Sequence, residues 1–139
     1  MRHESPEISS RRLAAVGSRN TRPELIVRRM LHEMGLRFRL HRRDLPGRPD
    51  IVLPRWGTVV VVHGCYWHRH GGCCHTQRPM RNSEFWLAKF ERNIELDREN
   101  QRELRRLGWR VVIVWECETR NSVKLGRRLR RLFPEDASP

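Results

Sequence analysis

Two short runs of apolar residues constrain the fold more than any other feature of the sequence. Residues 58–62 are Thr-Val-Val-Val-Val and residues 111–115 are Val-Val-Ile-Val-Trp, so neither run alternates between apolar and polar positions. A strand that is apolar on both faces is buried on both faces, as in a sheet covered by helices. The two runs therefore predict two central strands of an α/β sheet.

The segments around these strands predict the other elements. Thr21 and Glu24 form a capping box with Pro23 in the first turn, which begins a helix that runs to Met34 and ends at Gly35. Residues 36–40 alternate strictly, as in a half-buried strand. The other predicted elements are a short strand at 51–53, a helix from Asn82 or Ser83 to about Leu107, and a basic helix at 122–133.

The order α-β-β-β-α-β-α predicts an α/β domain with helices on both faces of a mixed sheet. With 139 residues, the chain has room for one domain. We expect residues 1–20 to form an N-terminal arm, residues 21–134 the domain, and residues 135–139 a tail.

The charge of the chain points to a polyanionic partner. Lysine and arginine total 29 against 16 aspartate and glutamate, a formal net charge of +13, and all but Lys89 and Lys124 are arginines. A GC-rich genome would also favour arginine over lysine, but it does not explain the net charge. Nucleic acid is the first candidate partner.

The sequence excludes a membrane protein. Its longest purely apolar run has five residues, at 111–115, and the N-terminus lacks the apolar stretch of a secretory signal. We therefore expect a cytoplasmic, nucleoid-associated protein. In that reducing compartment the four cysteines are expected to be thiols or metal ligands, not disulfides.

Cysteine and histidine cluster after the first central strand, and one cysteine follows the second. Thiolates and imidazoles are the preferred ligands of zinc, and a structural site takes four of them. The predicted zinc ligands are Cys65, His70, Cys73 and Cys117. If the two strands are neighbours, Cys65 and Cys117 emerge side by side. Cys74 competes with Cys73 for the third position, His75 is a weaker rival, and the alternative is four reduced thiols.

Asp50, directly before the short strand at 51–53, is a candidate magnesium ligand. Magnesium binds one or two carboxylates and phosphate oxygens, and a nearby neutral histidine can serve as a base for water. Glu24, His63 and His68 are candidates for the same site. The alternative is a simple turn, because Pro-Asp pairs are common in turns.

Aromatic residues accompany these groups in a stretch that contains no acidic residue between Asp50 and Glu84. Tyr66 and Trp67 lie in the predicted loop, and Phe85 and Trp86 at a helix start. Aromatic side chains in a basic segment suit stacking on bases or wedging between them. Core packing is the alternative for Phe85.

Four motifs together resemble the very-short-patch-repair DNA mismatch endonuclease family. They are Leu45-Pro-Gly-Arg-Pro-Asp50, His63-Gly-Cys-Tyr-Trp-His68, Glu84-Phe-Trp86 and Leu107-Gly-Trp-Arg-Val-Val-Ile-Val-Trp-Glu-Cys117. The resemblance runs from about Ser18 to Glu118, in family order. It implies a restriction-endonuclease-like three-layer α/β/α domain with a structural zinc loop. It also implies a Mg²⁺-dependent nick 5′ to the T of a T·G mismatch left by deamination of 5-methylcytosine.

The resemblance also implies roles for single residues. Asp50 would bind the metal, His68 would be the general base, and His63 and Glu24 would assist at the scissile phosphate. Cys65, His70, Cys73 and Cys117 match the family's zinc ligands. The residues that match DNA contacts of the family are Tyr66, Trp67, Trp86, Lys89, Asn93 and, in the arm, Leu13.

The implied partner is double-stranded DNA with a T·G mismatch, bound by a monomer, with repair factors and a cytosine methyltransferase suggested by the family. Two alternatives stay open. One is a zinc-stabilised DNA-binding module without catalysis, and the other is a nickase without mismatch selectivity.

Overall fold

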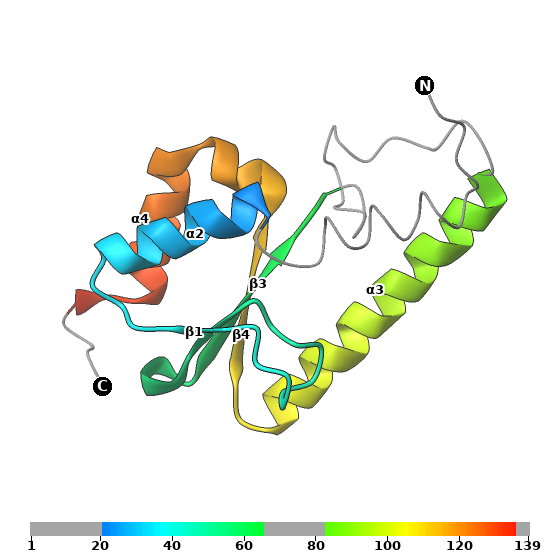
Figure 1. Cartoon of the computed structure of the whole chain (residues 1–139), viewed down its shortest axis with the longest axis horizontal. Coiled ribbons are helices and arrows are strands. Elements are labelled where there is room, and N and C mark those ends of the chain that lie inside the picture. The colour runs from blue at the N-terminus through cyan, green and yellow to red at the C-terminus, as the bar shows by residue number, and fades with distance from the viewer. Residues whose placement is uncertain (1–20, 66–82, 136–139) are drawn as a thin grey trace.

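The computed structural model describes residues 21–65 and 83–135, which form three α-helices and a four-stranded sheet (Figure 1). The helices are α2 (Arg22–Glu33), α3 (Ser83–Arg106) and α4 (Ser122–Leu132). The strands are β1 (Arg39–Leu40), β2 (Ile51–Leu53), β3 (Thr58–His63) and β4 (Arg110–Trp115). Two short 3₁₀ turns, η1 (Pro54–Trp56) and η2 (Glu116–Arg120), follow β2 and β4. The predicted mixed α/β class is confirmed. None of the described helices combines the length and the apolar character that crossing a membrane requires.

The sheet has the strand order β1-β2-β3-β4. β1 and β2 are antiparallel, as are β2 and β3, whereas β3 and β4 are parallel, with Val59 opposite Val111 and His63 opposite Trp115. The long helix α3 makes the crossover between the two parallel strands, as a parallel connection requires. The C-terminal ends of β3 and β4 therefore lie side by side at one end of the sheet.

Two separate apolar clusters show that helices cover both faces of this sheet (Figure 1). On one face α2 and α4 pack against the sheet, with Leu31 of α2 and Leu129 of α4 beside Val60. On the other face Leu104 of α3 packs with Val52 and Val59. Successive residues of a strand point to opposite faces, so the unbroken valine run of β3 supplies both clusters.

Helix α2 begins as its sequence predicts. Thr21 caps it, because its Oγ1 accepts the backbone N–H of Glu24 at 3.3 Å, and Pro23 occupies the first turn. The helix ends at Glu33, and Gly35 follows at φ +80°, a conformation that glycine adopts without strain. The cap fixes the first turn of α2, where Glu24 is buried.

Two sequence-based expectations are wrong in part. The strand expected at 36–40 is limited to Arg39–Leu40, because its ladder would continue toward Pro54, which has no N–H to donate and begins a 3₁₀ turn. Leu36 and Phe38 still pack against the core without strand pairing. The run at 111–115, expected to be a second central strand, lies at the edge of the described sheet. Val112 and Val114 are buried on one face and Val111 is partly buried on the other, so helices on both faces give β4 the sequence pattern of a central strand.

Candidate active site

Asp50, directly before β2, is held by contacts with β3 and with the residue that follows β1. Its Oδ2 accepts the backbone N–H of Val62 at 2.8 Å, and its backbone carbonyl accepts the N–H of His41 at 3.1 Å. The turn before it depends on Gly47, which has φ +74° and would place a Cβ 2.9 Å from the Asn100 side chain of α3. Glycine is therefore required there for both backbone conformation and space. These contacts fix where the Asp50 carboxyl lies.

Burial raises the pKa of Asp50 from its ordinary 3.8 to about 7. Desolvation is the main cause, and the neighbouring carboxyl of Glu24 raises the pKa further by its hydrogen bond and its charge. The N–H of Val62 opposes this effect, because it stabilises the carboxylate form. A buried carboxyl with such a perturbed pKa is typical of functional sites.

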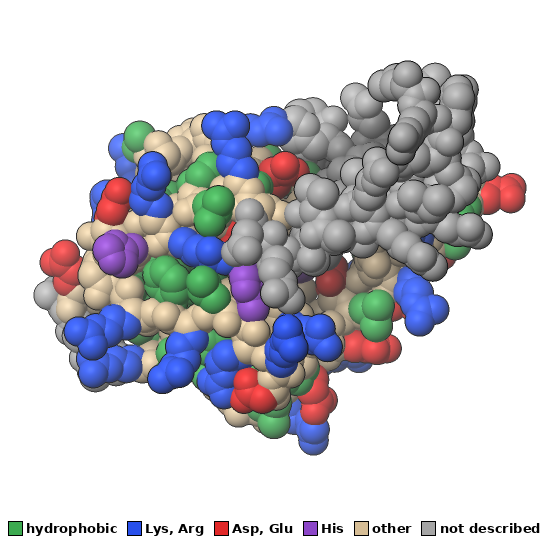
Figure 2. Space-filling view, in the orientation of Figure 1, with side chains coloured by type: hydrophobic (Ala, Val, Ile, Leu, Met, Phe, Trp, Pro, Cys, Tyr) green, Lys and Arg blue, Asp and Glu red, His purple; other side chains and the backbone are tan. Residues whose placement is uncertain are grey.

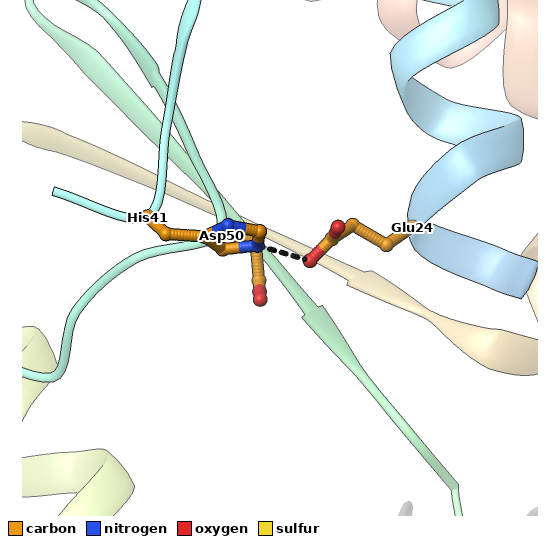
Figure 3. Close-up of side chains that lie close together, drawn as sticks. All are labelled: Glu24, His41 and Asp50. Carbon is orange, nitrogen blue, oxygen red and sulfur yellow. Dashed lines mark hydrogen bonds and ion pairs between the residues drawn. The ribbon is translucent and has the colours of Figure 1, made fainter. Parts of the chain in front are cut away.

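Glu24 faces Asp50 from α2, and its side chain is only 1% exposed. Each of its two oxygens contacts a basic group: Oε2 accepts a hydrogen bond from Arg28, one helical turn along α2, and Oε1 lies 3.0 Å from Nε2 of His41. Figure 3 shows His41 and Asp50 facing Glu24 from the sheet side. The buried charge is thus paired, as burial of a carboxylate requires.

Glu24, His41 and Asp50 form what we call the acid–histidine cluster, whose ligand atoms all lie within 4.8 Å of one another. The two carboxylates provide the hard oxygen donors that Mg²⁺ prefers, so the donor set fits that ion. The sequence predicted the two acids at one site, and the structure brings them together. The sequence did not predict that His41 belongs to this cluster. The available signal was the hairpin register, since Leu40 pairs with Ile51 and the next residues along, His41 and Asp50, face each other.

His63, the last residue of β3, is also buried, and its side chain faces α3. Its Nε2 lies 4.0 Å from Oδ1 of Asp97, and its ring packs edge-on against Trp115 with centroids 5.2 Å apart. It follows Val62, whose N–H binds Asp50, by one residue. The backbone of His63 therefore adjoins the residue that holds Asp50, while its ring is held between β4 and α3.

Cys65 and Cys117 lie together at the end of the sheet, as expected from adjacent strands. The Cys117 backbone N–H donates to Sγ of Cys65 at 3.4 Å across 52 residues of sequence. Cys65 is fully buried. The two predicted zinc ligands that the structure describes are therefore neighbours at this end of the sheet.

The turn that carries Cys117 is fixed by an ion pair. Glu118 accepts the N–H of Trp115 at 3.1 Å and both carboxylate oxygens contact Arg128 of α4, at 2.7 and 2.9 Å. The same guanidinium donates to the carbonyl of Ile113 at 2.8 Å. Arg128 thus joins α4 to both β4 and the turn that follows it.

Trp86, Lys89 and Asn93 share one face of α3, because they are spaced by three and four residues. Trp86 is half-buried, contacts Phe85 and Phe90 through its ring, and lies 5.5 Å from Nζ of Lys89. Asp97, which faces His63, continues this stripe by one more turn. The predicted DNA-contacting residues of α3 are therefore on the same face as the residue that contacts His63.

Basic side chains spread over the described part of the face in Figure 2, with fewer acidic ones between them. This distribution agrees with the net charge of +13. Several predicted site residues lie outside the described residues: Leu13, Tyr66, Trp67, His68, His70 and Cys73, with the alternatives Cys74 and His75.

Comparison with known proteins agrees with these features. A model of the DNA mismatch endonuclease Vsr family matches residues 3–75, just over half of the chain. The type II nicking enzyme V.XorIIP of Xanthomonas oryzae pv. oryzae is 47% identical over 129 residues, 93% of this chain and 94% of that protein. The DNA mismatch endonuclease Vsr of Escherichia coli is 42% identical over 116 residues, 84% of this chain and 74% of that protein. The chain therefore belongs to the DNA mismatch endonuclease Vsr family.

Proposed function

We propose that the protein nicks one strand of double-stranded DNA 5′ to the T of a T·G mismatch, in a reaction that depends on Mg²⁺. The observation that carries this proposal is the acid–histidine cluster, in which Asp50 and Glu24 meet within metal-binding distance of each other in a strongly basic chain. A binding module has no use for a buried carboxylate pair beside phosphates, since like charges repel DNA. Membership of a family of DNA mismatch endonucleases supports the same reaction.

The chemistry follows from the groups at the site. Asp50 and Glu24 would hold Mg²⁺, which when bound supplies an acidified water and offsets negative charge on the phosphate. Asp50 is fixed by the Val62 N–H at one carboxylate oxygen, which also holds its other oxygen in place. His68 would accept the proton of the attacking water, and His63 would assist at the scissile phosphate.

The zinc site is proposed to be structural. The pair Cys65 and Cys117 supports two of its ligands, with His70 and Cys73 completing the four. With four protein ligands no position is open for substrate, so zinc would stabilise the end of the sheet and the loop after β3.

Mismatch recognition is proposed to use aromatic side chains. A T·G pair is already poorly stacked, so inserting a wedge there costs less than in a matched duplex. Trp86, with Lys89 and Asn93 on the same face of α3, would contact the mismatch region together with Tyr66 and Trp67. Arginines on the surface would contact phosphates and position the enzyme.

The test is single-turnover cleavage of end-labelled duplexes with one T·G pair and randomised flanking base pairs, which also reports any sequence preference. Matched duplexes, EDTA and the Asp50→Asn protein are the controls. We expect a nick 5′ to the mismatched T that needs Mg²⁺ and is lost in each control. DNA binding by Asp50→Asn should persist, because that change removes a negative charge.

Other outcomes separate the alternatives. Equal nicking of matched and mismatched duplexes would identify a nickase without mismatch selectivity. Binding without cleavage at any Mg²⁺ concentration would leave only a DNA-binding module and refute the proposal.

A further inference from the structure

His41 contacts both acidic residues of the acid–histidine cluster, Asp50 through its backbone and Glu24 through its ring. Its backbone N–H donates to the Asp50 carbonyl at 3.1 Å, which continues the β1–β2 ladder by one residue. Its ring Nε2 lies 3.0 Å from Oε1 of Glu24 (Figure 3). One residue therefore connects the strand that carries Asp50 to the helix that carries Glu24.

The backbone of His41 adopts an uncommon conformation. Its φ is +47°, in the left-handed region that non-glycine residues seldom occupy. Such a conformation is unfavourable for a residue with a Cβ and persists where surrounding contacts determine it. His41 is held here by the ladder bond to Asp50 and by ring contacts with Glu24 and Arg28.

The ring contact is directional. Nε2 of His41 lies 3.0 Å from Glu24 Oε1 and 3.4 Å from the Arg28 guanidinium, which donates to Glu24 Oε2; in the tautomer protonated at Nε2, His41 donates to Oε1. Arg28 and Glu24 belong to the same helix, so their bond cannot fix α2 relative to the sheet. The His41 bond can, since His41 follows β1 directly and α2 is a separate element.

We propose that His41 is a positioning residue whose Nε2–H donor sets the separation between the Glu24 and Asp50 carboxylates, and thereby the affinity of the site for a divalent cation. The inference deepens the proposed function and rests on it. Outer partners that orient metal-binding carboxylates typically change metal affinity by 10- to 100-fold when removed. The donor is the property that matters, so an amide NH of similar reach should replace it.

The test compares His41→Gln with His41→Met, two side chains of similar length of which only glutamine has an N–H donor. Mn²⁺, which like Mg²⁺ suits carboxylate ligands, is titrated into the metal-free full-length protein without DNA, and free Mn²⁺ is followed by electron paramagnetic resonance. His32→Met is the matched control, because His32 is an exposed histidine of α2. The Mg²⁺ concentration for half-maximal nicking is measured in parallel.

We expect His41→Met to weaken Mn²⁺ binding about tenfold, and His41→Gln and His32→Met to stay within about threefold of the unsubstituted protein. The half-saturating Mg²⁺ concentration should shift in the same order. If His41→Met does not fold, the glutamine variant decides, because it must retain cation affinity.

Three results would overturn the inference. The first is equal cation affinity in all variants. The second is an equal loss of cation affinity in the glutamine and methionine variants. The third is ¹⁴N coupling to bound Mn²⁺ in the unsubstituted protein that is absent when His41 is replaced. The last would make His41 a ligand. Failure of the proposed function is distinguishable: cation binding that depends on His41, without any DNA cleavage, would refute nicking and leave the positioning role intact.

Discussion

Replacing Asp50 by asparagine should make the metal-free protein more stable at alkaline pH. Folding raises the pKa of this carboxyl from 3.8 to about 7, so between these pH values the folded state binds more protons than the unfolded chain. The free energy of unfolding therefore falls as the pH rises through this window. The loss amounts to at most about 4 kcal/mol, complete above about pH 8. Asparagine does not titrate, and its amide oxygen can still accept the Val62 N–H.

The assay is urea unfolding followed by circular dichroism, in EDTA, at steps between pH 4.5 and 8. The difference in unfolding free energy between Asp50→Asn and the unsubstituted protein should grow with pH in favour of the variant. Adding Mg²⁺ at pH 8 should stabilise the unsubstituted protein and leave the variant unchanged, since a ligand stabilises only the state that binds it. Two curves that run parallel across the whole pH range would show that Asp50 is not held in a desolvated, acid-paired site.

Three other substitutions test how the fold positions the site. Gly47→Ala should lower the unfolding free energy, measured by urea denaturation, by about 1 kcal/mol or more beyond Gly35→Ala. Both glycines have positive φ, but of the two only Gly47 would place a Cβ against a side chain, at 2.9 Å from Asn100. Equal losses would contradict the close packing. Glu118→Ala should lower the melting temperature by several degrees, whereas Glu116→Ala should not, since of the two only Glu118 bonds both Trp115 and α4. Equal melting temperatures for the two variants would show that the ion pair does not stabilise the turn. Cys117→Ser should lower the zinc content measured by atomic absorption, and unchanged stoichiometry would exclude Cys117 as a ligand.

Much of the arrangement could be predicted because it depends on local pattern. The valine run of β3 and the apolar run of β4 indicated buried strands, and their parallel pairing brings Cys65 and Cys117 together as expected. The capping residues of α2 placed Glu24 in its first turn. These features depend on periodicity and caps, which a single sequence displays directly.

The remaining features depend on tertiary contacts. Alternation at 36–39 matches the exposure pattern of the segment, but pairing also needs a partner strand, and Pro54 ends β2 early. Helix packing on both faces gives β4 the composition of a central strand although it is at the edge of the described sheet. His41 was missed because its role follows from hairpin register and a left-handed backbone, neither of which residue type reveals.

On the ribosome, β3 leaves the exit tunnel long before its parallel partner β4, because all of α3 is made between them. The elements that carry the acid–histidine cluster are complete once residue 63 has been synthesised, and their antiparallel pairings are local. Until β4 follows, the valine-rich edge of β3 has no neighbour, and such an edge pairs readily with other chains. A chain cut before residue 110 is therefore expected to aggregate.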